Sequence, residues 1–343
     1  MRLSEKMLTF IECSGSPLQM GREYGEQTKN EIQRNIELFG RSWDISRSGE
    51  KIAKIEHVIK KYLPEAYPEL LGISEGANVD VGHVLLMNHV DTFGDDVERC
   101  TPVLLRSEKD GMIIAKNNDS PSPEDYRFVL RKCKPDTGVP FIQVTYAGWL
   151  SGLDCMNAEG LANTHGSVGS IFNKSGSRID IRLKSYQLMQ TCRTVDGFIG
   201  GLNGTPLTGK GFNIAAGDAS GNTVMLDAAV PFIAVFNHNK KFDYATNIYK
   251  FPGLENADMR AARERDICVY RYGYLKWLEE TTPPENLDDI KKLLSCHAPW
   301  APCRHRGPHD SQTDWSMINL IKDRKTLVAY GAPCKNKYKE YNL

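Results

Sequence analysis

A cysteine and a polar cluster downstream of it carry the strongest chemical signal in this sequence. Cys100 follows Arg99 at the point where helical patterning gives way to strand patterning. An apolar run then ends in a cation, two amides and a carboxylate: Lys116, Asn117, Asn118 and Asp119. A thiol becomes a strong nucleophile when it loses its proton, and polar groups at a strand end can orient reacting groups around it. Free cysteines are more often small core residues, so it is this position, and not the residue type, that selects Cys100.

The residues before this cysteine are patterned as helices. Apolar side chains recur at helical spacing over residues 21–38, 51–63 and 68–73. Asp80 precedes the next apolar run and is placed to cap a further helix. We therefore expect residues 1–99 to form a helical N-terminal segment.

From Cys100 onward the pattern changes to short apolar or alternating runs separated by turn residues. These runs predict strands at 103–105, 111–115, 128–130, 141–146, 213–216, 223–227 and 232–236. Tight turn sequences between neighbouring runs favour hairpins, and therefore a largely antiparallel sheet. Helical patterns return at 179–191, 257–280 and 287–294, before a last strand pair at 315–321 and 326–331. Strands combined with grouped helices favour an α+β layered fold for residues 100–343.

Composition narrows the classes of partner. The chain has 343 residues, of which 41% are hydrophobic and 25% charged, as in ordinary globular proteins. Its 43 basic and 43 acidic side chains give no net field to attract nucleic acid or a membrane surface. No apolar stretch approaches the roughly 20 residues of a membrane helix, and charges occupy the start, where a signal peptide would be apolar. We expect a cytoplasmic protein that acts on a small molecule, with no nucleic-acid and no membrane partner.

Cysteine and histidine usage does not follow a known pattern of disulfides or metal ligands. The nine cysteines lack a repeating pair spacing, which argues against a disulfide framework. One loop is crowded with such residues: Cys296, His297, Cys303, His305 and His309. Their spacing fits neither paired C-x-x-C units nor H-E-x-x-H. The sequence-based expectation is therefore that the protein binds no metal.

Several segments together resemble one enzyme family. The chain is similar to the acyl-coenzyme A:6-aminopenicillanic-acid acyltransferases, a family of N-terminal-nucleophile (Ntn) cysteine hydrolases to which the choloylglycine hydrolases are distantly related. The matching segments are Cys100-Thr101, residues 115–119, GLDCMNAEGLANTH at 152–165, Thr246-Asn247, Cys303-Arg304-His305, Thr313-x-x-Ser316 and Gly331-x-Pro333-Cys334. Upstream, Gly21-x-x-x-Gly25 and residues 70–81 resemble the helical prosegment of the family. The resemblance thus runs over nearly the whole chain.

The resemblance implies a particular architecture and processing. It implies an Ntn-hydrolase αββα four-layer sandwich of two mainly antiparallel sheets, preceded by the helical prosegment. The protein would cut itself between Arg99 and Cys100 into an alpha chain, residues 1–99, and a catalytic beta chain, residues 100–343. The two pieces would stay associated as a heterodimer, and a higher oligomer is left open. No cofactor is expected, and an acyl-coenzyme A or another acyl donor would enter as a substrate.

The expected chemistry follows from a cysteine at a new N-terminus. Such a residue carries a nucleophilic sulfur and an α-amine of pKa about 7.7–8.0, which can take the thiol proton and pass it to a leaving amine. Asp119 would hold this amine by a charge-assisted hydrogen bond. The resemblance assigns the oxyanion to the Asn247 amide and a backbone N–H near His165 or Gly166. Supporting or substrate-binding roles fall to Lys116, Asn118, His165 and Arg304. The expected reaction is hydrolysis or acyl transfer at a linear amide of a small molecule, through a Cys100 thioester.

Four positions depart from the pattern of the family. Lys116 stands where the family has Arg, which loses the planar fork for binding a carboxylate. Arg99 precedes the cysteine where a small residue is common, Gly166 stands where relatives often have Asn, and Ile248 replaces a His. The departures at Lys116, Gly166 and Ile248 support a second hypothesis, an uncleaved and catalytically silent relative that acts as a small-molecule binding protein.

Overall fold

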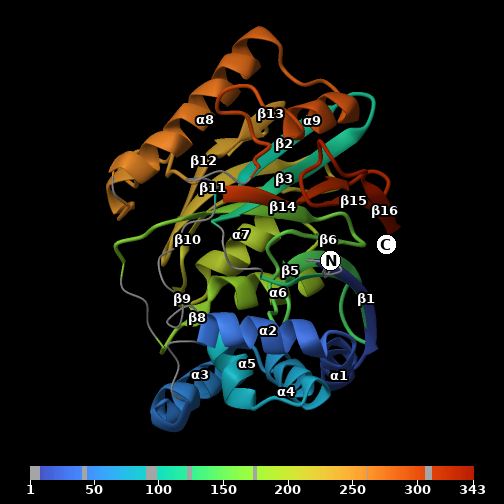
Figure 1. Cartoon of the computed structure of the whole chain (residues 1–343), viewed down its shortest axis with the longest axis vertical. Helices are drawn as coiled ribbons and strands as arrows, with labels where there is room; N and C mark the ends of the chain where they lie inside the picture. The colour runs from blue at the N-terminus through green and yellow to red at the C-terminus, as the bar shows by residue number, and fades with distance from the viewer. Residues whose placement is uncertain are drawn as a thin grey trace, which may run out of the picture.

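Two β-sheets stack face to face in the computed structural model, with helices on both outer sides (Figure 1). The structure describes residues 8–40, 45–89, 99–121, 126–172, 176–260, 262–305 and 311–343. Going from one side to the other, the layers are helix, sheet, sheet and helix. The expected αββα four-layer sandwich is confirmed.

The first sheet has eight strands and spans both parts of the chain. In spatial order it contains β1 (Leu8–Gly15), β4 (Phe128–Pro135), β5 (Phe141–Tyr146), β6 (Cys155–Asn157), β7 (Ala162–Val168), β10 (Gly211–Gly217), β11 (Thr223–Ala229) and β12 (Phe232–His238). Neighbouring strands are antiparallel, except that β1 runs parallel to β4. The N-terminal segment is thus not only helical, because β1 forms an edge of this sheet.

The second sheet has six strands and carries the predicted site. Its order is β13 (Phe242–Tyr244), β2 (Thr101–Ser107), β3 (Gly111–Pro121), β14 (Ser311–Leu320), β15 (Lys325–Tyr330) and β16 (Lys339–Asn342). All of its described pairings are antiparallel, as the turn residues predict. A separate short parallel pair joins β8 (Ile179–Asp180) to β9 (Leu207–Thr208).

Helices cover the outer face of each sheet (Figure 1). The first sheet is covered by α1 (Pro17–Gln27), α2 (Lys29–Phe39), α3 (Gly49–Tyr62), α4 (Ala66–Ala77), α5 (Val81–Met87), α6 (Ile181–Thr191) and α7 (Val195–Asn203). The second sheet is covered by α8 (Ala262–Thr281) and α9 (Leu287–Leu294). Two 3₁₀ turns, η2 (Ile45–Arg47) and η4 (Glu255–Ala257), lie in the connections. Among the described helices, none combines the length and apolarity needed to span a bilayer.

The side chains between the sheets follow the two-residue period of a strand. On β3, Met112 and Ile114 point into the core between the two sheets, whereas Ile113 and Ala115 pack against the α8–α9 side. The same alternation continues into the polar end of β3. Successive polar residues there must therefore face opposite layers.

The N-terminal helices pack closely through glycine. A Cβ at Gly21 on α1 would lie 2.1 Å from the carbonyl oxygen of Glu69 on α4, and one at Gly25 would lie 2.5 Å from that of Ile73. Such distances leave no room for a side chain, so the Gly21-x-x-x-Gly25 spacing allows the two backbones to approach. The predicted cap is also present, because the Asp80 side chain accepts a hydrogen bond from the N–H of Gly82 at the start of α5.

Candidate active site

The β2–β3 hairpin brings Cys100 beside the polar end of β3. Thr101 pairs with Asn117, which sets Cys100 across from Asn118 at the end of the ladder. The Cys100 thiol donates a 3.5 Å hydrogen bond to Oδ1 of Asn118. Both side chains are buried, and Cys100 is 0% exposed. The nucleophile predicted from sequence therefore lies inside the molecule, against an amide from the predicted cluster.

Asp119 is also buried and is held by the neighbouring strand β14. Its Oδ1 accepts a 2.7 Å hydrogen bond from the Thr313 hydroxyl, and its Oδ2 lies 3.7 Å from Nε of Arg304. Its backbone carbonyl accepts a hydrogen bond of 3.1 Å from the N–H of Arg99. Burial raises the pKa of Asp119 to about 6, although the positive charges of Arg271 and Arg304 act to lower it. This carboxyl therefore titrates near neutral pH.

Arg271 on α8 joins the predicted groups and was not predicted from the sequence. It is 0% exposed, and its Nη1 donates a 2.5 Å hydrogen bond to the carbonyl oxygen of Arg99. Its Nη2 donates to Oδ1 of Asn247 at 2.6 Å and to the carbonyl of Thr246 at 3.1 Å. The guanidinium also attracts the Cys100 sulfur when the thiol is ionised. One buried cation thus contacts the carbonyl that precedes the cysteine and the predicted oxyanion amide.

The helical pattern contains a signal for Arg271. Cys268 and Leu275, three residues before and four residues after Arg271, are both buried on α8. A residue at these spacings lies on the same helix face, which predicts that Arg271 points into the protein. A buried arginine requires oxygen partners, and this requirement marks it as a candidate site residue.

Asn247 is held in an unusual backbone conformation. Its φ is 65°, in the left-handed region, where Asn is among the more tolerant residues. Its amide Nδ2 donates to the carbonyl of Ser167 at 2.8 Å, while Arg271 donates to its Oδ1. Its own carbonyl accepts a hydrogen bond from Arg260, which also forms an ion pair with Asp258 at 2.6 Å. Both ends of the Asn247 side chain and its backbone are thus fixed before any substrate binds.

Gly166 leaves space for this amide. A Cβ at position 166 would lie 3.1 Å from Nδ2 of Asn247 and 3.3 Å from Cδ of Pro102. Both distances are tighter than ordinary van der Waals contact, so even alanine would push on Asn247 or on the residues after Cys100. The departure from the family at this position therefore has a local packing reason.

Lys116 and His165 meet on a carboxylate that sequence reasoning did not select. Nζ of Lys116 lies 2.9 Å from Oδ2 of Asp154, and Nδ1 of His165 lies 3.0 Å from the same oxygen. Burial alone would raise the pKa of Asp154, but the charges of His165 and then Lys116 hold it well below its usual range. Lys116 comes from the second sheet and Asp154 precedes β6 of the first, so this pair bridges the two sheets.

The backbone N–H of His165 is also engaged by this carboxylate. It donates to Oδ1 of Asp154 at 3.2 Å, and the Thr164 hydroxyl donates to the same oxygen at 2.6 Å. A backbone N–H near His165 or Gly166 is expected from the sequence to face an oxyanion. In the structure the N–H of His165 is instead bonded to Asp154 and orients that carboxylate. The supporting residues separate into a Lys116–Asp154–His165 group and a group around Asp119.

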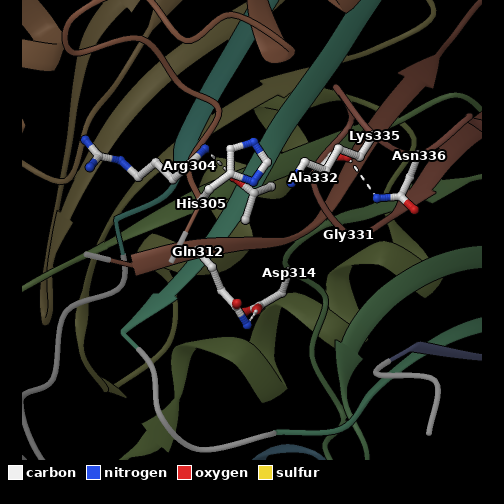
Figure 2. A pocket seen from close by; sticks show the side chains of 9 residues that line it. Arg304, His305, Gln312, Asp314, Gly331, Ala332, Lys335 and Asn336 are labelled. Carbon is white, nitrogen blue, oxygen red and sulfur yellow. Dashed lines mark hydrogen bonds between the residues drawn. The ribbon is translucent and has the colours of Figure 1, made fainter. Parts of the chain in front are cut away.

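Arg304 borders a cavity of about 230 Å³ beside Asp119. The cavity is lined by Arg304, His305, Gln312, Thr313, Asp314, Gly331, Ala332, Lys335 and Asn336. Figure 2 shows the Arg304 guanidinium extending away from Ala332 and Asn336. The backbone N–H of Arg304 donates to the Thr313 hydroxyl at 3.0 Å, and this hydroxyl in turn donates to Asp119. Arg304, expected as a cation near the site, is therefore brought beside Asp119.

Comparison with known proteins supports the resemblance. No family model matches this sequence. The chain is 24% identical over 172 residues to the 40 kDa form of acyl-coenzyme A:6-aminopenicillanic-acid-acyltransferase from Emericella nidulans. This match covers 47% of each chain, so it spans about half the length of that relative. The resemblance to the acyltransferase family is confirmed by this match.

Solved structures with partial similarity include an acylase and a hydrolase. Penicillin V acylase from Agrobacterium tumefaciens superposes with a TM-score of 0.48 at 14% identity, over 71% of this chain and 86% of the other. A variant of conjugated bile acid hydrolase from Clostridium perfringens superposes with a TM-score of 0.45 at 11% identity, over 71% of this chain and 97% of the other.

Proposed function

We propose that this protein is an amide hydrolase or acyltransferase that cuts its own chain between Arg99 and Cys100 and then uses Cys100 as its nucleophile. The observation that carries the proposal is the environment of the bond to be cut. The carbonyl oxygen of Arg99 accepts a hydrogen bond from the buried cation Arg271, and the next residue holds the buried thiol. A donor at the carbonyl oxygen favours nucleophilic attack, because negative charge develops there in the transition state.

Self-cleavage would proceed by acyl transfer followed by hydrolysis. The Cys100 sulfur attacks the carbonyl carbon of Arg99 and loses its proton. The C–N bond then breaks, and the amide nitrogen takes up a proton to become the α-amine of Cys100. Water opens the resulting thioester, which leaves a carboxylate on Arg99 and returns the thiol to Cys100.

Turnover of substrate would reuse the same groups. The new α-amine takes the thiol proton, the sulfur attacks the substrate amide, and the amine returns the proton to the leaving nitrogen. Removal of the Arg99 carbonyl leaves Arg271 and the Asn247 amide as candidate donors for the substrate oxyanion. Asp119, whose backbone carbonyl accepts a hydrogen bond from the N–H of Arg99, would supply the carboxylate that holds the charged amine.

The substrate class is a linear amide of a small molecule. The relative from Emericella nidulans is named for acyl-coenzyme A and 6-aminopenicillanic acid. An acyl-coenzyme A or another acyl donor is therefore a candidate substrate here. Hydrolysis and transfer share the acyl-enzyme and differ only in whether water or an amine reaches the thioester.

The intact mass of the purified protein under denaturing conditions tests self-cleavage. We expect two fragments, residues 1–99 and 100–343, from the wild type and one uncut chain from Cys100→Ala. Cys13→Ala removes a different buried thiol, in β1, and should cut like the wild type. A single uncut chain in all three proteins would contradict the proposal and favour an uncleaved binding protein.

Acid quenching tests the acyl-enzyme. After mixing with a panel of acyl-coenzyme A and amide substrates, the 100–343 fragment should gain the mass of an acyl group at Cys100. Cut protein that acquires no acyl mass and releases no amine from any member of the panel would remove linear amides as the substrate class.

A further inference from the structure

Two loops bring two thiols and two imidazoles to one point. His297, Cys303 and His305 lie on the segment after α9, and Cys334 follows β15. Their ligand atoms all lie within 4.8 Å of one another. Nε2 of His305 lies 2.9 Å from Nε2 of His297 and 3.1 Å from Sγ of Cys334. Figure 2 shows the His305 ring beside Ala332, at the edge of the cavity next to Arg304.

Hydrogen bonds alone do not account for the two short contacts of His305 with His297 and Cys334. Nε2 of His305 carries either one proton or one lone pair in the ring plane, so it can form one full hydrogen bond, to His297 or to Cys334, but not two. Thiols are weak donors and do not make up the difference. A cation at the centre would instead accept a lone pair from every member of the cluster.

The ligand set and its size fit zinc. Two thiolates and two imidazoles are a common tetrahedral zinc set, with Zn–S about 2.3 Å and Zn–N about 2.0–2.1 Å. These lengths place neighbouring ligand atoms of a tetrahedron roughly 3.3–3.8 Å apart. In this cluster the distances between ligand atoms include one of 2.9 Å and none above 4.8 Å. Small movements of the side chains would therefore bring the four atoms to the corners of a zinc tetrahedron.

We propose that His297, Cys303, His305 and Cys334 bind one Zn²⁺ ion. Four protein ligands leave no open position, so the site is structural and not catalytic. This inference does not depend on the proposed amide chemistry. It replaces the sequence-based expectation that the protein binds no metal.

The position of the site indicates what the metal would stabilise. Arg304 lies between two of the ligands, Cys303 and His305, and its Nε lies 3.7 Å from Asp119. Zinc would fix the backbone on both sides of Arg304 and attach it to the loop of Cys334. The metal would therefore act as a positioning device for the wall of the 230 Å³ cavity and for the cation beside Asp119.

The loop that is crowded with cysteine and histidine in the sequence supplies three of the four proposed ligands, although its spacing argued against a metal. Cys296, one of the candidates, has other neighbours, because its sulfur lies 3.4 Å from the Tyr274 hydroxyl and 3.4 Å from the N–H of Ala298. His309 lies outside the described residues. Cys334 is far along the sequence and joins the set only because β15 returns the chain to this loop.

Metal content and cobalt spectroscopy test the proposal on the full chain, prepared without an affinity tag and with its thiols reduced. We expect about one zinc per chain by elemental mass spectrometry. After chelation, titration with Co²⁺ alone should give the intense visible bands of tetrahedral cobalt with thiolate ligands. Cys100→Ala should bind the same amount of metal, which separates this result from any failure of the amide chemistry.

Ligand and control variants locate the site. His297→Asn and Cys334→Ser should each weaken Co²⁺ binding by more than the roughly 10–100-fold that loss of an outer-shell partner costs. Cys296→Ser removes a neighbouring thiol outside the set and should bind like the wild type. The exposed His297 gives a variant that keeps the test valid if Cys334→Ser fails to fold.

Three results would overturn the proposal. The first is a reduced wild type with neither stoichiometric zinc nor cobalt–thiolate absorption. The second is unchanged cobalt binding in His297→Asn and Cys334→Ser. The third is a Cys303–Cys334 disulfide in protein purified without added oxidant, because it would remove both thiolates from the set.

Discussion

The guanidinium of Arg271 donates a 2.5 Å hydrogen bond to the carbonyl oxygen of Arg99, the residue directly before Cys100. The contact joins helix α8 to the start of the second sheet, and 171 residues separate the two positions in sequence. Arg271 is fully buried, so it acts on that carbonyl from a site with little competing water. The arrangement concentrates positive charge where a tetrahedral intermediate would carry its negative oxygen.

Replacing this donor should slow self-cleavage. We expect Arg271→Met to reduce the rate at which the chain is cut by about 10²–10³-fold, the usual effect of losing one oxyanion donor. The rate is measured from the intact-mass time course of freshly synthesised protein. Arg265→Met, on the same helix, is the matched control and should cut at the wild-type rate. Equal rates for Arg271→Met and wild type, with both folded, would rule out this role for Arg271.

Adding one carbon at Gly166 should disturb the Asn247 amide. Gly166→Ala places Cβ 3.1 Å from Nδ2 of Asn247, so the amide must shift and turnover should fall at least several-fold. Gly200→Ala in α7 is the control, since its Cβ meets no atom within 4 Å, and it should gain up to about 1 kcal/mol of stability. Steady-state kinetics and thermal unfolding measure the two effects. Undiminished turnover in Gly166→Ala would show that the amide position is not critical.

Asp119 should make stability depend on pH. Burial raises its pKa to about 6 in the folded chain, so the folded state binds this proton more tightly than the unfolded state, where the pKa is about 3.9. The associated stabilisation is complete below about pH 4 and is lost as pH rises through about 6. Asn does not ionise and so loses nothing over this range. As pH rises from about 4 to about 6, the free energy of unfolding of Asp119→Asn should therefore increase by about 3 kcal/mol relative to that of its parent.

Chemical unfolding at several pH values measures this difference. Both proteins should carry Cys100→Ala so that the chain stays uncut. Asp266→Asn, an exposed position on α8, is the control. A constant stability difference between Asp119→Asn and its parent from pH 4 to pH 8 would contradict the raised pKa.

Replacing only one member of the Lys116–Asp154 pair should lower the free energy of unfolding of the protein. Both side chains are buried, 2.9 Å apart, so Lys116→Met leaves the carboxylate with His165 as its partner cation and should cost up to about 3–5 kcal/mol. Adding Asp154→Asn to this variant should recover part of the loss. A double-mutant cycle by denaturant unfolding measures the coupling energy, and additive effects would argue against a direct interaction.

The two fragments should stay associated after cleavage. Glu69 on α4 accepts a 2.7 Å hydrogen bond from Arg131 on β4, and the Tyr186 hydroxyl lies 2.7 Å from the same carboxylate. These buried contacts join the segment before Cys100 to the rest of the molecule. The 1–99 and 100–343 fragments should therefore elute together in native size-exclusion chromatography.

Removing the buried carboxylate should weaken this association. Glu69→Ala leaves the Arg131 charge buried without its partner, at a cost of about 3–5 kcal/mol. Glu75→Ala, on the same helix, breaks an exposed pair with Arg22 and should cost no more than about 1 kcal/mol. Fragments that separate in the wild type would show that the prosegment is released.

Local patterning was sufficient to predict most of the elements. The expected helix at 287–294 and the strand at 141–146 match α9 and β5 at both ends. The strands β1, β7 and β16 were not predicted, because charged or small polar residues interrupt their apolar patterns and pairing with neighbours stabilises them instead. Helix α7 was missed as well, since its glycines weaken a helical pattern.

The sequence by itself determined the α+β class, the position of Cys100 before a hairpin and the polar cluster that the hairpin aligns beside it. These features depend on residues close together in the chain, where side-chain period and turn chemistry act directly. Only the tertiary structure decided that Arg271 contacts Arg99, that Asp154 joins Lys116 to His165, and that Cys334 meets His305. Such contacts arise from strand order and sheet stacking, and a buried charge or ligand takes the partner that packing supplies, whatever its distance in sequence.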